Sequence, residues 1–180
     1  MLTRQTILNA FAAVGRALRI NRDVEILIVG SAAGILTGEL PQDWATGDVD
    51  LIWCHLPFDR DEVLDTAAAV TIPLGLTAGW LNDFSGLFRW NLPVGWEQRR
   101  VRIGVFDHLI VSAVSRIDLI TMKFLSRRSQ DRDQLTAMRV RQEELVQVVA
   151  ALDALEQEYP EHKSALDQSR YIISVWSPHL

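Results

Sequence analysis

Residues 26–53 constrain the fold more than any other part of the chain. An apolar run ends in Gly30 and Ser31, a segment of small residues follows, and the sequence Asp48-Val49-Asp50 opens a second apolar run. Side chains two residues apart on a strand point to the same side, so Asp48 and Asp50 reach one edge together. A Gly-Ser turn before a helix leaves backbone N–H groups free to bind phosphate. The stretch therefore predicts a site for a metal-bound nucleoside triphosphate, because hard cations prefer carboxylate oxygen ligands.

The composition indicates a small acidic protein with enough apolar material for a packed core. The chain has 180 residues, of which 48% are hydrophobic, and a net charge of −5. That charge argues against general coating of nucleic acid, although Arg99, Arg100 and Arg102, or a second group of arginines at 127, 128 and 132, leave a local basic patch open. The single cysteine, Cys54, excludes an intrachain disulfide framework and is expected to be a buried thiol.

The N-terminus and the hydropathy of the chain predict a cytoplasmic protein without a membrane span. Residues 1–20 place arginines among apolar residues, which is typical of an amphipathic helix and unlike a signal peptide. No uninterrupted apolar run reaches the ~20 residues that cross a bilayer.

The periodicity of the apolar residues places the strands first and most of the helices later. We predict strands over residues 25–29, 49–54, 99–106 and 108–114, and helices over 6–18, 32–37, 61–70, 130–140, 142–159 and 163–175, with another helix starting at Arg116. Residues 72–95, rich in glycine, proline and aromatics, are predicted to be irregular. This order favours the α+β class, with a core over residues 1–115 and a helical part over 116–180 packed on it as one compact unit.

Three other kinds of site are disfavoured. The sequence from Val29 to Gly34 follows a strand but lacks the G-x-G-x-x-G spacing of a dinucleotide-binding turn, and it is not a G-x-S-x-G nucleophile elbow. The four histidines show no metal-ligand spacing and no partner cysteine pair, so a zinc site is not expected; they are His55, His108, His162 and His179.

The order of these motifs resembles the nucleotidyltransferase fold shared with DNA polymerase beta. Many of its members have Gly-Gly or Gly-Ser, followed by T-x-D-h-D-h, in which h is apolar. This chain has Gly30 and Ser31, followed by Thr46-Gly47-Asp48-Val49-Asp50-Leu51. Residues 80–83 (WLND), 92–99 (LPVGWEQR) and 116–123 (RIDLITMK) resemble a little-characterised bacterial group related to the toxins of abortive-infection type E systems. The resemblance covers roughly residues 25–138 and implies a mixed β-sheet flanked by helices, with a helical C-terminal part.

The resemblance also implies roles for individual residues. Gly30 and Ser31 would hold triphosphate oxygens, and Asp48 and Asp50 would bind Mg²⁺ or Mn²⁺. Lys123 would match a helix lysine that faces the nucleotide phosphates in the toxin relatives. The residues after it, Arg127, Arg128, Asp131 and Asp133, resemble a K…R…D pattern, although the two acids also suit the first turn of a new helix.

A third carboxylate usually completes the metal site of this fold on a later strand. Asp107 is our candidate, because it follows the parity of Val101, Ile103 and Val105 and closes that strand; Asp83 and Glu97 are the rivals. One departure concerns substrate choice. Relatives often carry arginine two residues before the threonine of the motif, and this chain has Trp44 there.

Two functional hypotheses follow. The first is an enzyme that moves a nucleotidyl group from an NTP to the hydroxyl of an unknown acceptor, such as an RNA like tRNA, a protein or a small molecule, with metal assistance. Such an enzyme would also suit the toxin of a toxin–antitoxin system, with an antitoxin protein as partner. The second is a catalytically inactive binding or regulatory module that retains the fold, and Trp44 and the unsettled third carboxylate favour it.

Overall fold

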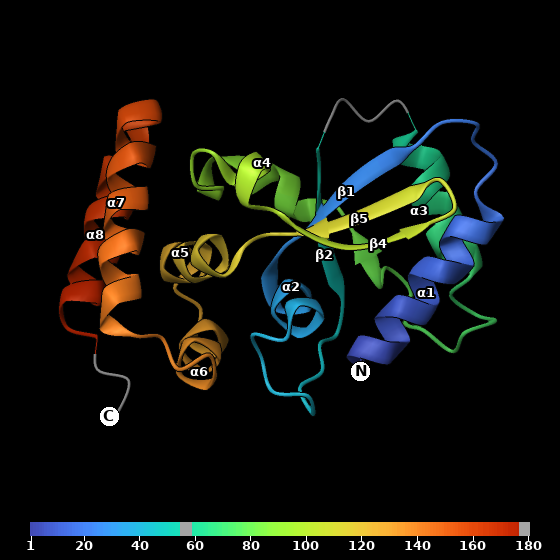
Figure 1. The fold of residues 1–180 in the computed structure, drawn as a ribbon, viewed down its shortest axis with the longest axis horizontal. Coiled ribbons are helices and arrows are strands. Elements are labelled where there is room, and N and C mark those ends of the chain that lie inside the picture. Colours follow the sequence, from blue (N-terminus) through green and yellow to red (C-terminus); the bar gives the residue numbers. More distant parts are fainter. Residues whose placement is uncertain (55–58, 177–180) are drawn as a thin grey trace.

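One mixed sheet of five strands forms the centre of the first part of the chain (Figure 1). The structure is a computed structural model that describes residues 1–54 and 59–176. The strand order is β3-β2-β1-β5-β4, in which β1 is antiparallel to β2 and parallel to β5. β3 is parallel to β2, and β4 is antiparallel to β5. This mixed sheet with its flanking helices confirms the α+β class and is consistent with a nucleotidyltransferase-like fold.

The strands of the sheet are β1 (Val24–Ile28), β2 (Val49–Trp53), β3 (Leu81–Asn82), β4 (Val101–Phe106) and β5 (Leu109–Ala113). The helices before residue 115 are α1 (Arg4–Ala17), α2 (Gly30–Thr37), α3 (Arg60–Ala69), the 3₁₀ helix η1 (Phe84–Asn91) and α4 (Trp96–Arg99). From residue 116 the described chain is helical, with α5 (Arg116–Ser126), α6 (Ser129–Ala137), α7 (Gln142–Glu158), the 3₁₀ helix η2 (Pro160–His162) and α8 (Lys163–Ser174).

The segment predicted to be irregular contains two ordered elements, β3 and η1. β3 is only two residues long, and it pairs Leu81 with Val49 and Asn82 with Asp50. The backbone N–H of Val49 also donates to the carbonyl of Trp80 at 2.6 Å. A strand of two residues is too short to show a periodicity in the sequence. Its extended conformation depends on the pairing with β2, which lies far away in the chain.

Helix α1 approaches the sheet closely at Gly15. Phe11 on the same helix contacts the rings of Trp80 and Phe106 at centroid distances of 6.0 and 5.9 Å. A Cβ atom on Gly15 would lie 2.2 Å from the carbonyl oxygen of Phe106 in β4. The absence of a side chain at this position therefore lets the helix rest directly on the backbone of the strand.

Replacing Gly15 with alanine is expected to destabilise the protein by about 1–3 kcal/mol, the usual cost of overpacking a core. Alanine favours a helix interior over glycine by ~1 kcal/mol, so a loss of stability would report the clash with Phe106. Urea unfolding measures the change. The matched control is Gly86→Ala, because a Cβ there has no atom within 4 Å. Equal stability of the two variants would contradict this packing.

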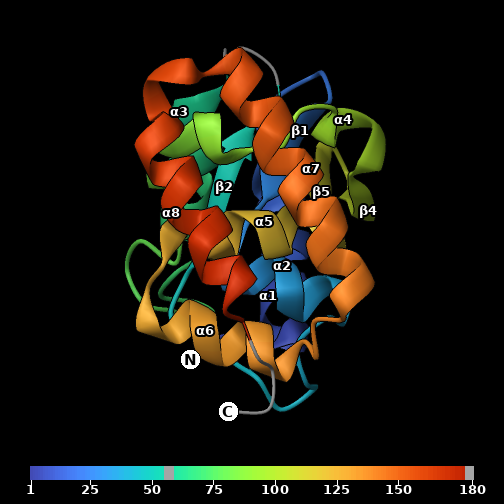
Figure 2. The same cartoon turned by 90° about the vertical axis from the view of Figure 1, so that its left-hand side faces the viewer.

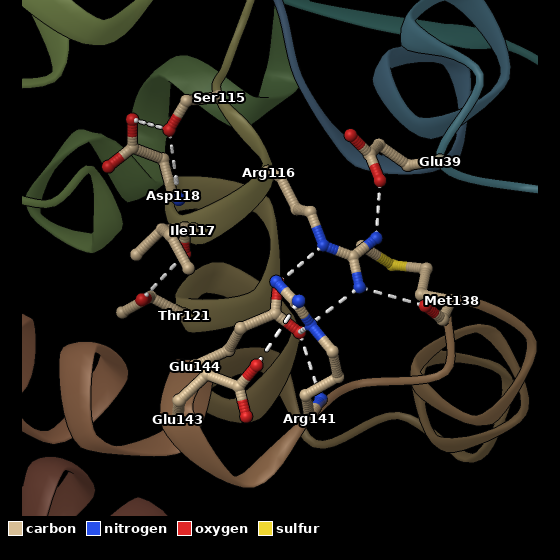
Figure 3. A network of polar contacts seen from close by, with 10 residues as sticks. All are labelled: Glu39, Ser115, Arg116, Ile117, Asp118, Thr121, Met138, Arg141, Glu143 and Glu144. Carbon is tan, nitrogen blue, oxygen red and sulfur yellow. Dashed lines mark hydrogen bonds and ion pairs between the residues drawn. The ribbon is translucent and has the colours of Figure 1, made fainter.

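Helix α5 makes the main helix contact between the helical part and the rest of the molecule. Helix α5 contacts α2 on one side and α6, α7 and α8 on the other, and α7 and α8 lie side by side at the far end of the molecule (Figures 1 and 2). At the start of α5 the guanidinium of Arg116 binds three groups, as Figure 3 shows. It donates to Glu144 of α7 at 2.6 Å, to the carbonyl of Met138 at 2.8 Å and to Glu39 after α2. One side chain thus ties α2, α5, α6 and α7 together.

Among the described residues, none of the helices combines the length and the apolar character that a bilayer span requires.

Candidate functional site

The ends of two neighbouring strands bring Gly30 and Asp50 together. The backbone N–H of Val29, after β1, donates to the carbonyl of Asp50 in β2 at 3.0 Å. A Cβ atom on Gly30 would lie 3.3 Å from Asp50 Oδ2, so the carboxylate rests against the glycine backbone. Asp48 lies two residues earlier, just before the start of β2, and is exposed. The antiparallel pairing of β1 and β2 therefore places the end of β1, before Gly30, beside the start of β2, which holds Asp50.

Gly30 and Ser31 begin helix α2. Gly30 has a φ of +64°, a conformation that side chains rarely adopt, which explains the glycine at the turn from strand to helix. Val29 at the N-cap contributes no capping side chain. The first N–H groups of a helix have no intrahelical partner and attract anions. The turn therefore has the polarity that phosphate oxygens need, directly beside the Asp50 carboxylate.

The electrostatics of Asp50 reflect a crowded, partly desolvated site. Burial raises the pKa of Asp50 above its usual range, and the nearby negative charge of Asp48 raises it further. A side-chain hydrogen bond with Asn82, the positive charge of Arg128 and a hydrogen bond with Ser85 lower the pKa in opposition. A half-buried carboxylate that a second, exposed carboxylate repels forms a site that a cation would stabilise.

A chain of polar contacts connects Ser31 to the helical part. Gln134 of α6 donates from Nε2 to Ser31 Oγ at 2.8 Å, and its Oε1 accepts from the ammonium of Lys123. Lys123 Nζ also lies 3.1 Å from Asp131 Oδ1, and both side chains are buried. Arg128 donates to the other oxygen of Asp131 at 3.0 Å. Gln134 of α6 thereby holds the Ser31 hydroxyl, and the ammonium of Lys123, itself paired with Asp131, holds Gln134.

The ammonium of Lys123 is thus held inside the protein, between α5 and α6. Burial lowers the pKa of Lys123, while Asp131 favours its charged form. Burial also raises the pKa of Asp131, but the hydrogen bond from Ser126 and the charge of Lys123 outweigh it, so the pKa lies below its usual range. Asp131 lies in the first turn of α6, whereas Asp133 is exposed on the same helix.

Gly30, Asp50, Lys123 and Asp131 line one pocket of about 510 Å³, a size typical of small-molecule sites. Gly30 and Asp50 lie on its sheet side, and Lys123, Arg127 and Arg128 on its helical side. The third wall comes from η1 with four side chains, Phe84, Ser85, Trp90 and Asn91. The pocket therefore combines the start of a helix, the carboxylates of Asp50 and Asp131, and two arginines.

Asp107 is not brought to this pocket, which corrects the prediction of Asp107 as the third carboxylate. It occupies the turn between β4 and β5 with a φ of 51° and is exposed. That turn precedes Leu109, which pairs with Val24 at the start of β1, whereas Gly30 follows Ile28 at the end of β1. The length of β1, roughly 13 Å at 3.3 Å per residue, separates the two places.

The rival acids also lie outside the pocket. Asp83 binds Arg60 at 2.6 Å and accepts from Trp53 Nε1 at 2.9 Å, and the hydrogen bonds with Arg60 hold its pKa below the usual range. Glu97 is exposed on α4. The residue beside Asp50 on the next strand is instead Asn82, which sequence reasoning missed. Asn82 is identified by the pairing of β3 with β2, a contact between distant segments that the sequence does not show.

The remaining predicted features have structural roles or lie outside the described residues. Trp44, in the loop between α2 and β2, is partly buried and packs against the hydrophobic core. Cys54 is half-buried, and burial raises the pKa of its thiol to about 12. His108 contacts Asp23, and the ring of His162 stacks on Trp90 at 3.9 Å. His55 and His179 fall outside the described residues.

The comparisons with known proteins give a family. No curated protein and no solved structure matches the sequence. Residues 5–177 match a family described as nucleotidyltransferases of unknown function, DUF6036. The match covers the Gly30 turn, the Asp48 and Asp50 carboxylates and every described helix of the C-terminal part. The chain therefore belongs to this family of nucleotidyltransferases of unknown function.

Proposed function

We propose that the protein transfers a nucleotidyl group from a nucleoside triphosphate to the hydroxyl of an acceptor, with Mg²⁺ or Mn²⁺ as cofactor. The observation that carries this proposal is the meeting of Gly30, at the start of α2, and the Asp50 carboxylate at one pocket. Membership of a nucleotidyltransferase family supports it. The acceptor is an RNA such as tRNA, a protein or a small molecule.

The residues present fit a divalent cation whose remaining ligands come from the substrate phosphates and water. No group of three acid, histidine or cysteine side chains able to hold a metal occurs in residues 1–54 and 59–176. Mg²⁺, however, is commonly held by one or two carboxylates together with substrate phosphates and water. Asp48 and Asp50 supply two such carboxylates, and their mutual repulsion favours a cation. When bound, the cation would lower the pKa of the acceptor hydroxyl and offset the charge on the phosphates.

The chain's own groups position the triphosphate. The N–H groups at the start of α2 bind phosphate oxygens, and Gln134 fixes the Ser31 hydroxyl beside them. Arg127 and Arg128 line the same pocket and offset the charge of the triphosphate. The acceptor oxygen then forms a bond to the α-phosphorus while the bond to the bridging oxygen breaks. Pyrophosphate leaves, and the hydroxyl proton passes to solvent.

A second candidate, a module that binds nucleotide without transferring it, is favoured by Asn82. Asn82 pairs with Asp50 at a position where a carboxylate would supply a third acid. The two functions differ in one experiment. The protein is titrated with Mg²⁺ and each NTP, and is then incubated with α-labelled NTPs and pools of RNA, protein and small molecules. Incorporation of label supports transfer, whereas binding without incorporation supports the module.

The resemblance to abortive-infection toxins adds a biological role to the proposal. Expression of the wild-type chain in bacteria is expected to arrest growth, because nucleotidyl transfer to a cellular acceptor would disable it. The Asp50→Asn variant is expected to permit growth at the same protein level, measured by immunoblot. Normal growth with wild-type protein at that level would contradict the toxin role and would leave nucleotidyl transfer to be judged by the labelling assay.

A further inference from the structure

The structure decides between the two groups of arginines that the sequence offers for contact with nucleic acid. In the first group, Arg99 binds Asp118 at 2.6 Å. Arg100 and Arg102 lie 3.0 and 3.7 Å from the same oxygen of Glu25. Each member of this group therefore already has a carboxylate partner in the folded protein.

The second group, Arg127, Arg128 and Arg132, is largely unpaired. Arg128 lies 3.0 Å from Asp131, whereas Arg127 and Arg132 have no acidic partner among the described residues. All three side chains are exposed. Guanidinium groups that are exposed and close together in the chain are well suited to bind phosphate oxygens.

These arginines line a groove of about 320 Å³ formed by the end of α5, by α6 and by the end of α8. Both α6 and α8 lie toward the viewer in Figure 2. Lys123 joins the three arginines, and no acid is among the described residues that line the groove. The other lining side chains are mostly apolar and include Phe124, Leu135, Ile172, Val175 and Trp176. The groove thus combines cations with apolar surface, as a nucleotide unit of a strand requires.

The groove adjoins the pocket of the proposed reaction. Lys123, Arg127 and Arg128 line both the groove and the pocket that holds Gly30 and Asp50. Arg132 lines the groove but is not among the described residues that line the pocket. A molecule held in the groove therefore lies beside a triphosphate bound in the pocket.

Tyr171 of α8 adds an exposed aromatic ring next to the groove. It is 69% exposed and lines an open hollow together with Arg127 and Ile172, which also line the groove. Aromatic rings beside cations are the surfaces on which bases of single strands stack. Groups for phosphates and for a base therefore lie side by side.

We infer that the groove and Tyr171 bind the end of a single-stranded nucleic acid, and that this strand is the acceptor. The inference rests on the proposed function. Arg127 and Arg132 bind phosphates of the strand, and Tyr171 stacks on a base. A terminal sugar hydroxyl of the strand forms the bond to the α-phosphorus, pyrophosphate leaves, and the hydroxyl proton passes to solvent. RNA and DNA share this chemistry, whereas an acidic protein has no base for Tyr171.

The test measures binding of a fluorescent single-stranded RNA of about 12 nucleotides to the full-length protein by anisotropy, without Mg²⁺ or NTP. Between about 50 and 200 mM salt, the logarithm of the affinity should fall with the logarithm of the salt concentration with a slope of about −2, because each of three phosphate contacts on a single strand contributes about 0.7. Arg132→Gln should weaken binding roughly fivefold and reduce the slope by about 0.7. Tyr171→Ala should weaken binding by a similar factor, roughly fivefold, without changing the slope, because stacking releases no counterions.

Two further probes identify the kind of acceptor. A DNA strand of the same sequence shows by its relative affinity which sugar the groove prefers. Poly-glutamate of the same charge should bind at least roughly tenfold more weakly than the better strand, because it lacks the bases that stack.

The controls separate binding of the strand from folding and from binding of the nucleotide. Arg16→Gln makes the same substitution at an exposed position of α1, at the opposite end of the molecule from α8 (Figure 1), and should change neither affinity nor slope. Arg132→Gln should melt at the wild-type temperature, because Arg132 has no acidic partner among the described residues. The same variant should bind α,β-methylene analogues of the four NTPs in Mg²⁺ as the wild type does, measured by titration calorimetry.

Wild-type affinity and slope in Arg132→Gln, or equal affinity for poly-glutamate and both strands, would overturn the inference. A failure of the wild-type protein to bind any of the four analogues would instead overturn the proposed nucleotide site. The two failures are distinguishable, because the strand is titrated without Mg²⁺ or NTP.

Discussion

Replacing Asp50 with asparagine is expected to reduce nucleotidyl transfer by roughly 10³-fold, the upper range for removing one group that stabilises charge in a transition state. Asp48→Asn is expected to act in the same direction, because the cation would lose one of two carboxylate ligands. Incorporation of α-labelled nucleotide into the accepting pool measures both changes. Asp107→Asn is the matched control and should keep wild-type activity, since Asp107 lies in the turn between β4 and β5.

The same Asp50→Asn variant should not lose stability. The pKa of Asp50 is raised in the folded protein, by burial first and by Asp48 second, so its charged form costs folding free energy. That cost is absent at pH values below the unfolded pKa and fully present above the folded pKa, which includes neutral pH. Asparagine removes the charge, so urea unfolding at pH 7 with a chelator should show equal or greater stability.

These two readouts together test the assignment. A structural carboxylate would lose stability when it is neutralised, whereas a carboxylate retained for binding a cation costs stability and contributes activity. Full transfer activity in Asp50→Asn would remove Asp50 from the site. Loss of activity accompanied by a large loss of stability would assign it a structural role instead.

Replacing Glu144 with glutamine is expected to cost about 3 kcal/mol of unfolding free energy at pH 7. The hydrogen bonds from Arg116 are the largest cause that lowers the pKa of Glu144, from 4.5 to about 2, and the side chain is only 3% exposed. A pKa depression of this size corresponds to about 3 kcal/mol. Glutamine retains the hydrogen bond from the backbone N–H of Arg141 that begins α7, so the substitution isolates the charge that faces Arg116.

The pH dependence of this loss has a defined sign. The folded pKa of Glu144 lies below the unfolded value, so its stabilisation is complete above about pH 4.5 and disappears as the pH falls through about 2. The difference between wild type and Glu144→Gln should therefore shrink to about 1 kcal/mol at pH 3. Urea unfolding at pH 7 and pH 3 measures it.

The neighbouring acid provides the control for Glu144. Glu143 lies on the same turn of α7, is 64% exposed in its side chain and pairs with Arg141 at the surface (Figure 3). Surface ion pairs contribute ~0–1 kcal/mol, so Glu143→Gln should change little at either pH. A loss for Glu144→Gln as small as the loss for Glu143→Gln would show that the Arg116 network does not hold the helical part to α2.

Local pattern was sufficient for most elements and for half of the pocket. The strand before Gly30 and the strand after Asp48 are visible in the sequence as short apolar runs, and the long helices as apolar residues that recur with a period of 3.6. The spacing of Asp48 and Asp50 predicts that both point to one side of an extended segment, and β2 itself begins between them at Val49. These features could be predicted because each depends on residues that are neighbours in the chain.

Sequence alone determined the α+β class, the Gly30 turn and the paired carboxylates of this protein, since backbone conformation and side-chain parity are local properties. Only the tertiary structure decided which distant groups meet there. The pairing of β3 with β2 put Asn82 beside Asp50, and the hairpin of β4 and β5 carried Asp107 away from it. The packing of α6 on α5 took the ammonium of Lys123 into a buried ion pair, and η1 brought Asn91 to the pocket. Such contacts depend on register and on packing between segments far apart in sequence, which no local pattern encodes.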